Sequence, residues 1–565
     1  MLWAVHLFCI WAGVCTLEAP LVNTKFGQIR GLDFERSDGQ WSELFLGIPF
    51  AKPPVGELRF EKPVMVDKWE NVLDATKYGP SCPPHNKSVT FPPSSEDCLH
   101  LSIIRPKDLD EQRKLPVLVW VHGGGYSAGS AANYPYPGLA NIYNAQRVIV
   151  VEIQYRLGFL GFFSDGDNLP GNFGLWDQLA ALKFVQEVIE DFGGDKEKVT
   201  IWGLSAGGAS VSQLALSPEA DGLFRGQIAM SGGSLMNWAF GENVLNHSRA
   251  LAKELGCPFN SGLKPCLKAL PLEKFYEAVE PLGSTQYSLD LLKWHPRIDG
   301  DLYPESAEKL IEKMPKRPQI MGVALKESLF FVVLNLAKSI HKLEVDPREF
   351  KNFDRAELER RIKDLVANSE YYHDQKDAVF EKVFAEYTRG EEHKQPGFYL
   401  EMYSKLLSDL NFNVGLVREA QLRAENDLPT FVYLTEHFNK AIYPEGYEVT
   451  GATHVCELPY VFELFPLGKY AIQGNPVEEK VNQFFQQSFI NFVKTGQPVN
   501  KISPWPSVTT ENVADLPYVH ITDSPRLQRG GYFARETEFW NRIARDYHFD
   551  AVTLTKTEKN GKSEL

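Results

Sequence analysis

The chain has 565 residues, of which 43% are hydrophobic and 23% are charged, a composition typical of a soluble globular enzyme. Its formal net charge is −14. Such an acidic surface repels phosphate groups, which argues against nucleic acid or an anionic membrane surface as a partner.

The first residues form a single apolar run, Met1–Val14. This run is too short to cross a bilayer and lies at the N-terminus, so it predicts a secretory signal peptide over residues 1–16. Cleavage is expected near Cys15 or Thr16. No later stretch is long and apolar enough to predict an integral membrane segment.

Five cysteines follow the signal segment, and their spacing suggests two short-range disulfides. The expected pairs are Cys82–Cys98 and Cys257–Cys266, and the alternative is five unrelated buried thiols. The remaining thiol, Cys456, would be either inert and buried or close enough to the active site to react with oxidants.

An exported chain can also carry glycans. Two acceptor sequences follow the signal segment, and they predict glycosylation at Asn86 and Asn246. The alternative is that either tripeptide arises by chance and stays unmodified.

No linker or internal repeat divides the chain, which predicts one large domain over residues 17–547 and a polar tail over residues 548–565. A helix is predicted over Leu175–Asp191, and the region Lys326–Gln421 is helix-rich. Short apolar, β-branched runs predict buried strands of a mostly parallel sheet, joined by right-handed crossovers. These runs are Leu115–Val121, Val148–Tyr155, Val199–Trp202, Gln227–Met230, Gln319–Val323 and Thr430–Leu434.

Two stretches match the G-x-S-x-G pattern of a nucleophile elbow, centred on Ser127 and Ser205. An elbow needs a strand that feeds a tight turn opening directly into a helix. Ser205 follows the strand Val199–Trp202 and precedes a run that can continue as a helix. Ser127 is followed by two prolines, which forbid a regular helix. The sequence therefore predicts Ser205 as a nucleophile, with a structural glycine-rich turn as the alternative.

A run of three glycines closes the first predicted strand of the sheet, at His122-Gly123-Gly124-Gly125. Glycines let backbone N–H groups approach a substrate oxygen with no Cβ in the way. In α/β-hydrolases such a loop supplies an oxyanion hole together with the residue after the nucleophile. The predicted donors are Gly124, Gly125 and Ala206, and the alternative is a flexible glycine turn.

With these motifs in place, the chain resembles a type-B carboxylesterase, the family that also contains cholinesterases and bile-salt-type lipases. Within that family it is most similar to the gut-type esterases of nematodes. The resemblance implies an α/β-hydrolase fold, with a large, mostly parallel sheet flanked by helices and a single domain with helical insertions. Collinear motifs from about Leu21 to Tyr547 carry it: Gly27–Gly31, Phe45–Ala51, Ser95–Leu99, the glycine run, Gln154–Gly158, Gly171–Gln178 and the elbow.

The resemblance also implies the rest of a catalytic triad. Glu327 would orient and stabilise the histidine, and His454 would take the proton of Ser205 and pass it to the leaving alcohol. Without the resemblance, Glu327 would be interpreted as a solvated loop residue. His437 is the rival histidine, because it follows the strand Thr430–Leu434.

Departures from the cholinesterases narrow the expected substrate. Cholinesterases carry an acidic residue just before the nucleophile and a tryptophan in the first disulfide loop, whereas this chain has Leu204 and a Cys82–Cys98 loop without tryptophan. We therefore expect neutral aliphatic or aryl esters as substrates, with no metal or cofactor. The alternatives are a lipase or sterol-ester hydrolase and, from another class, a non-catalytic adhesion relative.

The chain ends in Lys562, Ser563, Glu564 and Leu565, which is close to an endoplasmic-reticulum retrieval signal but has Ser at the second position. A retrieval receptor is therefore an expected partner, and the lumen of the endoplasmic reticulum is the favoured location. Secretion is the alternative.

Overall fold

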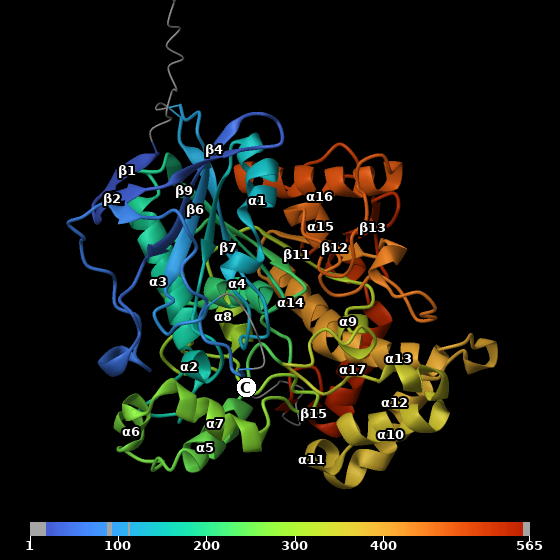
Figure 1. The fold of residues 1–565 in the computed structure, drawn as a ribbon. Coiled ribbons are helices and arrows are strands. Elements are labelled where there is room, and N and C mark those ends of the chain that lie inside the picture. The colour runs from blue at the N-terminus through green and yellow to red at the C-terminus, as the bar shows by residue number, and fades with distance from the viewer. Residues whose placement is uncertain (1–18, 88–92, 111–112, 558–565) are drawn as a thin grey trace, which may run out of the picture.

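The structure is a computed structural model that describes residues 19–87, 93–110 and 113–557. Its centre is a sheet of eleven strands in the order β14-β13-β12-β11-β10-β9-β7-β8-β6-β4-β3 (Figure 1). The expected signal peptide (residues 1–16) and the retrieval-like end (residues 562–565) lie outside the described residues.

The middle of this sheet is parallel and its edges are antiparallel, so the sheet is mostly parallel as predicted. The parallel strands are β7 (Leu115–Val121), β8 (Ile149–Ile153), β9 (Gly194–Leu204), β10 (Gly226–Met230), β11 (Gln319–Ala324), β12 (Thr430–Thr435) and β13 (Tyr518–Ile521). The antiparallel edge strands are β3 (Leu32–Glu35), β4 (Trp41–Pro49), β6 (His100–Pro106) and β14 (Arg526–Gln528). A separate small sheet contains β1 (Leu21–Thr24), β2 (Gly27–Arg30) and β5 (Leu73–Asp74).

The two faces of the sheet bury two hydrophobic clusters, as the alternation of side chains along β7 shows. Val119 and Val121 face one cluster, whereas Leu118 and Trp120 face the other. The Trp120 face is covered by α1 (Tyr136–Ile142), α15 (Leu458–Phe462) and α16 (Pro476–Thr495). The Val119 face packs against α3 (Phe173–Val188), α4 (Ala206–Leu216), α8 (Ala307–Lys313), α14 (Val414–Glu425) and α17 (Ala534–Tyr547).

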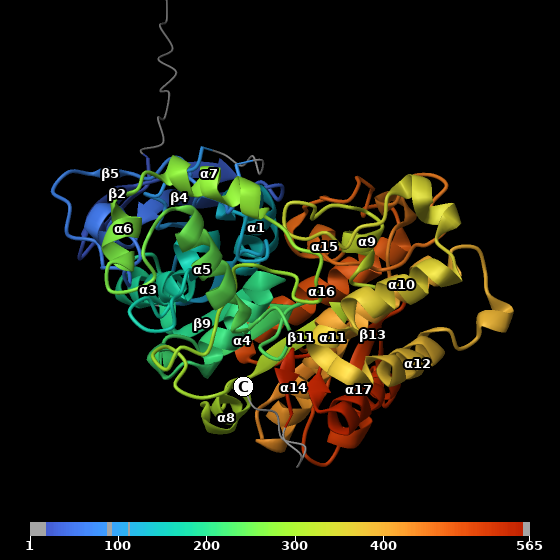
Figure 2. The same ribbon diagram turned by 90° about the horizontal axis from the view of Figure 1, so that it is seen from below.

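Two groups of helices extend beyond the lower end of the sheet, one on each side (Figures 1 and 2). The first group is α5 (Asn243–Glu254), α6 (Leu263–Ala269) and α7 (Leu272–Leu282), and the second is α10 (Arg355–Leu365), α11 (Ser369–Tyr372), α12 (Lys376–Tyr387) and α13 (Phe398–Ser408). Short helices α2 (Gly158–Phe162) and α9 (Leu329–Val332) complete the set. The second group confirms the helix-rich character predicted for Lys326–Gln421.

Both predicted disulfides are present. Cys82–Cys98 and Cys257–Cys266 have Cα–Cα distances of 5.0 and 5.7 Å, and Cys456 is free and buried. The first bond joins two residues of the segment before β6. The second bond joins the loop that follows α5 to Cys266 in α6.

The end of the described chain is folded back on the helices. Within the expected tail, β15 (Phe549–Asp550) and β16 (Thr555–Lys556) form a hairpin, and the ring of Phe549 stacks on Tyr371 at 4.8 Å. Asp550 also forms an ion pair with Arg418 of α14. Across the ranges that the structure describes, no helix is both long and apolar enough to cross a bilayer.

A buried ion pair fixes α3 to the chain that leaves β8. The Arg156 guanidinium donates to both carboxylate oxygens of Asp177 at 2.7 Å, and both side chains are buried. The backbone N–H of Arg156 donates to the same carboxylate at 3.0 Å. Removing one partner of such a pair leaves an uncompensated buried charge.

We therefore expect Asp177→Ala to lower the free energy of unfolding by about 3–5 kcal/mol, measured by urea titration. The control is Glu219→Ala, which removes an exposed ion pair with Lys183 at 3.2 Å and should cost less than about 1 kcal/mol. Equal losses in the two variants would contradict the importance assigned to the buried pair.

Candidate active site

Ser205 stands at a sharp bend between β9, which ends at Leu204, and α4, which begins at Ala206. Its backbone has φ 60° and ψ −127°, a strained conformation that costs about 1–3 kcal/mol. The surrounding structure holds this bend, because the Ser205 N–H donates to the carbonyl of Met230 at 2.8 Å. The strand, bend and helix that an elbow requires are all present at Ser205.

The glycines around Ser205 are required by the packing of backbone on backbone. A Cβ added to Gly203 would lie 2.1 Å from the carbonyl oxygen of Gly207. A Cβ added to Gly207 would lie 2.0 Å from the carbonyl oxygen of Val121 on β7. The elbow can therefore form only where small residues flank the serine.

His454 and Glu327 meet although 127 residues separate them in the chain. Glu327 lies in the turn after β11, and His454 lies in the turn that precedes α15. The Nδ1 atom of His454 is 2.6 Å from Oε2 of Glu327, and both side chains are almost fully buried. This contact favours a proton on Nδ1, which leaves Nε2 with a free lone pair.

The second oxygen of the Glu327 carboxylate is also held. Its Oε1 accepts hydrogen bonds from the Ser231 hydroxyl at 2.6 Å and from the N–H of Ala324 at 2.7 Å. Ser231 follows β10 and has φ 47°, and its own N–H donates to Gly322 at 2.8 Å. Sequence reasoning missed Ser231, because a serine one residue past a strand carries no distinctive pattern.

The glycine run lies directly against Ser205. A Cβ on Gly123 would be 3.1 Å from the Cβ of Ser205 and 2.6 Å from the carbonyl oxygen of Leu204. Gly124 and Gly125 have φ values of 122° and 59°, which side chains disfavour. Among the described residues, no acceptor takes the N–H of Gly124 or Gly125. Ala206, as the first residue of α4, also lacks an intrahelical acceptor for its N–H.

Ser205 and His454 line one cavity of about 290 Å³ together with Gly123, Gly124 and Gly125. In the part of the chain that the structure describes, neither the Ser205 hydroxyl nor Nε2 of His454 has a protein hydrogen-bond partner. Both atoms are thus available to a molecule in the cavity. Catalytic hydrogen bonds are commonly long before a substrate is bound and tighten only in the complex.

Aromatic side chains surround the histidine, and sequence reasoning missed them. The rings of Phe330, Phe331 and Phe412 have centroids 5.5, 5.4 and 5.3 Å from that of His454. Phe412 comes from a π-helical turn, Asp409–Asn413, between α13 and α14. Such turns often occur at functional sites, but nothing in the local sequence marks this one.

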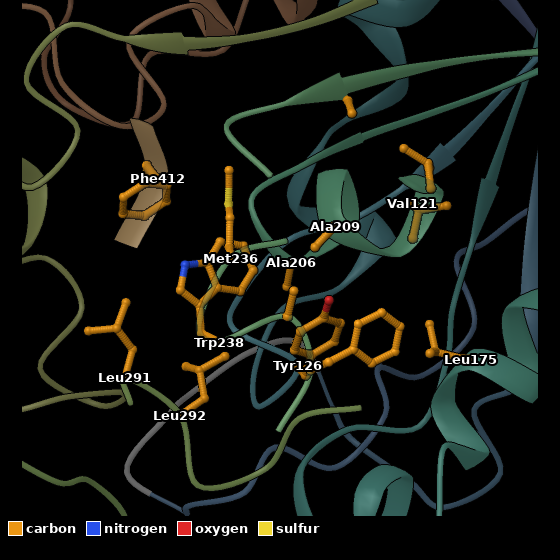
Figure 3. Packing of buried hydrophobic residues seen from close by; sticks show 14 of the residues in the cluster. Val121, Tyr126, Leu175, Ala206, Ala209, Met236, Trp238, Leu291, Leu292 and Phe412 are labelled. Carbon is orange, nitrogen blue, oxygen red and sulfur yellow. The ribbon is translucent and has the colours of Figure 1, made fainter. Parts of the chain in front are cut away.

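Most of the remaining wall of the cavity is apolar. The rings of Trp238 and Phe412 have centroids 5.7 Å apart. Both residues line the cavity together with Leu291 and Leu292, and all four are labelled in Figure 3. The indole N–H of Trp238 donates to the carbonyl of Asn411 at 2.7 Å, so its ring is fixed against the π-helical turn. Leu204, the residue before Ser205, also lines the cavity.

The two rival residues lie elsewhere. Ser127 is buried, its N–H donates to Gly124, and the turn around it does not lead into a long helix. His437 has Nδ1 2.8 Å from Asp523 and Nε2 3.4 Å from Glu478. Asp523 therefore holds Nδ1 of His437, and neither rival lines the cavity that contains Ser205 and His454.

Cys456 is buried near Glu327 but does not line the cavity. Its thiol is 3.8 Å from Oε2 of Glu457. Burial raises the pKa of this thiol well above its usual value, so the thiolate needed for reaction with oxidants is scarce at neutral pH. The structure therefore favours the inert interpretation of Cys456.

The predicted glycan sites differ in exposure. Asn246 is exposed on α5, whereas Asn86 is half-buried and its amide donates to the Ser284 hydroxyl at 2.8 Å. The hydroxyl of Ser248, in the second acceptor sequence, is buried and accepts from the N–H of Ser164 at 3.0 Å.

Glu457 is a second buried carboxyl group near Glu327. Burial, reinforced by the nearby charge of Glu327, raises the pKa of Glu457 to about 8. Its Oε1 accepts from the Thr435 hydroxyl at 3.3 Å. Glu457 therefore carries a proton at neutral pH, which avoids two adjacent buried negative charges.

This proton makes stability depend on pH. Between the ordinary glutamate pKa of 4.5 and about 8, the folded chain holds one proton more than the unfolded chain, so the free energy of unfolding falls as pH rises. We expect Glu457→Gln to flatten this fall between pH 5 and 8 by up to about 1.4 kcal/mol per pH unit, measured by urea titration. The control is Glu445→Gln at an exposed position, which should keep the wild-type dependence of the unfolding free energy on pH. If Glu457→Gln also kept the wild-type dependence, a raised pKa for Glu457 would be ruled out.

Comparison with known proteins identifies the class to which this fold and site belong. Residues 18–540 match the carboxylesterase family, and the chain belongs to it. The chain is thus an α/β-hydrolase and a carboxylic-ester hydrolase. This confirms both the fold and the family that the sequence motifs implied.

Among individual proteins, the chain is similar to gut esterase 1 of two nematodes. It is 38% identical to the protein of Caenorhabditis briggsae over 98% of this chain and 97% of that one. It is also 38% identical to the protein of Caenorhabditis elegans over 98% of each chain. Acetylcholinesterase of the snake Bungarus fasciatus is 31% identical over 100% of this chain and 92% of its own length.

Proposed function

We propose that the protein hydrolyses neutral carboxylic esters through an acyl-enzyme on Ser205. The observation that carries the proposal is the 2.6 Å contact between His454 and the buried Glu327, in a cavity that His454 shares with Ser205. A histidine held in this way can act as a general base toward a serine hydroxyl and later as a general acid.

In the proposed first step, Nε2 of His454 accepts the proton of Ser205 while Oγ bonds to the ester carbon. The carbonyl oxygen becomes an oxyanion, and the free N–H groups of Gly124, Gly125 and Ala206 would stabilise it. His454 then gives its proton to the leaving alcohol. In the second step, water attacks the acyl-enzyme, His454 takes a proton from the water, and the acid leaves with Ser205 reprotonated.

The cavity supports small neutral substrates. No charged side chain is found among the described residues that line it, and most of its wall is aliphatic or aromatic. A volume of about 290 Å³ is at the lower end of small-molecule sites, which span about 300–1,000 Å³. Both observations favour short aliphatic or aryl esters over sterol esters and over choline esters.

We also propose that the protein works in the secretory pathway, with retention in the endoplasmic reticulum favoured over secretion. Two disulfides are consistent with an oxidising compartment. The signal peptide, the retrieval-like end and glycans at Asn86 and Asn246 belong to the same proposal. Endoglycosidase treatment of the expressed protein tests this proposal, because removal of glycans lowers the apparent mass of the protein on a gel. An unchanged mass would argue against passage through the endoplasmic reticulum.

The nucleophile is tested by two serine variants that share one motif. Ser205→Ala should lower kcat for a short-chain aryl ester at least about a thousandfold, because the acyl-enzyme can no longer form. Ser127→Ala, at the other G-x-S-x-G match, should keep most of the activity. Comparable activity in both variants would refute a covalent role for Ser205.

Acyl-chain preference is tested with 4-nitrophenyl esters from acetate to oleate. We expect kcat/KM to peak at a short or medium chain and to fall steeply for oleate, because the cavity is small. A rate that keeps rising to oleate would favour the lipase alternative instead.

A further inference from the structure

The loop that carries the proposed oxyanion donors begins at His122, a histidine that the proposed mechanism does not use. Its side chain is fully buried and is not part of the cavity wall, so it can act on a substrate only through another residue. The Nδ1 atom of His122 is 2.9 Å from the carbonyl oxygen of the next residue, Gly123. Because a carbonyl oxygen can only accept, Nδ1 carries a hydrogen and donates it.

The ring of His122 is neutral and its orientation is fixed. Burial lowers the pKa of His122 to about 4, so at physiological pH the ring carries one hydrogen, the one on Nδ1. The ring stacks on that of Tyr155, with centroids 4.4 Å apart. The Tyr155 hydroxyl also donates to the carbonyl oxygen of His122 at 2.8 Å. Both the side chain and the backbone of His122 are therefore held in place.

The Gly123 carbonyl belongs to the same peptide unit as the N–H of Gly124, which is one of the proposed oxyanion donors. A peptide unit is planar, and this one is trans, so its C=O and its N–H point in opposite directions. Since His122 holds the carbonyl, the N–H of Gly124 points away from the buried imidazole. Gly124 lines the cavity, and no acceptor among the described residues takes its N–H. His122 thus orients a donor that it does not contact.

The two neighbouring peptide units of the glycine run are held by different means. In the second unit, the Gly124 carbonyl accepts from the N–H groups of Ser127 and Ala128 at 3.1 and 3.0 Å. In the first unit, the Gly123 carbonyl accepts from no backbone N–H of the described residues, and the His122 side chain supplies its hydrogen bond. The direction of the Gly124 N–H therefore depends on one side chain.

Gly129 leaves room for this side chain. A Cβ added to Gly129 would lie 2.3 Å from the carbonyl oxygen of Gly123 and 2.7 Å from Nδ1 of His122. Gly129 is also the last residue of the G-x-S-x-G match centred on Ser127. The glycine that makes Ser127 resemble a nucleophile is thus required for the contact between His122 and Gly123.

We infer that His122 is a positioning residue for ester hydrolysis, whose Nδ1–H group holds the Gly123 carbonyl and thereby aims the N–H of Gly124 at the oxyanion. The inference rests on the proposed acyl-enzyme mechanism at Ser205. Donors stabilise an oxyanion best when they are oriented before the charge forms. Without the hydrogen bond from His122, this peptide unit can rotate, and one of the proposed donors loses its alignment.

A transition-state analogue, trifluoromethyl butyl ketone, tests the inference. Oγ of Ser205 adds to the carbonyl carbon of the ketone, His454 takes the serine proton, and the ketone oxygen becomes an oxyanion like that formed from the ester. The inhibition constant, Ki, therefore measures how well the donors are aligned. A variant that only folds less well has fewer active sites, but each folded site keeps the wild-type Ki.

His122→Phe keeps a ring against Tyr155 but removes the donor. We expect this variant to lower kcat for 4-nitrophenyl butyrate by about ten- to a hundredfold, which is less than the loss of a whole oxyanion donor. KM should change little, because the full charge forms only in the transition state, and Ki for the ketone should rise by a factor similar to the fall in kcat. His122→Leu should give the same result and provides the answer if His122→Phe does not fold.

Two further variants separate the hydrogen bond from the loss of a buried histidine. His122→Asn keeps an amide N–H close to the place of Nδ1, so its Ki should stay nearer the wild-type value than that of His122→Phe. The control is His295→Phe. His295 is also buried, and its Nδ1 is 3.0 Å from the carbonyl oxygen of the next residue, Pro296, but it is not part of the cavity wall. This control should leave Ki unchanged.

A wild-type Ki in His122→Phe or His122→Leu, whatever the activity of the variant, would overturn the inference. It would mean that the backbone alone holds the peptide unit of Gly124. This failure is distinct from failure of the proposed function, because the ester would still be hydrolysed in a Ser205-dependent way. If Ser205→Ala kept its turnover of the ester, the proposed function itself would fall.

Discussion

The rest of the site depends on one backbone bend, in which Ser205 is held at a positive φ by its hydrogen bond to Met230. The bend is possible because residues 203 and 207 are glycines. A Cβ at either position would lie about 2 Å from a backbone oxygen, of the elbow itself for Gly203 and of β7 for Gly207. The packing of β9 and α4 in the folded domain offsets the free-energy cost of this backbone strain. Its consequence is a serine hydroxyl that projects into a cavity beside unpaired N–H groups.

The topology explains how the other groups reach that hydroxyl. β9, β10 and β11 are parallel neighbours, so Ser205, Ser231 and Glu327 all follow the same ends of adjacent strands. Each strand contributes one polar group at the edge where parallel sheets place their ligands. His454 arrives from the turn before α15 and completes the set through its contact with Glu327. These four side chains are far apart in the sequence, and the topology of the sheet brings them together.

Sequence patterns predicted the centre of the fold better than its edges and better than the cavity. β7 was predicted to the residue because both its faces are buried, which leaves an unbroken apolar run. β9 begins earlier than expected, since charged residues such as Glu197 are exposed at its start. Glu327 and His454 were placed by family resemblance alone. Phe412 could not be predicted, because its position depends on a π-helical turn that tertiary packing decides.

The assignment of every other group at the site depends on which oxygen atom reacts with the ester. An activated serine attacks the phosphorus of a fluorophosphonate and displaces fluoride. The resulting adduct can be located by mass spectrometry of the digested protein. One phosphonyl group per chain, on the peptide that contains Ser205, is the predicted result. Labelling of a different residue, or none in protein that hydrolyses esters, would contradict the assignment of the bend as the reactive centre.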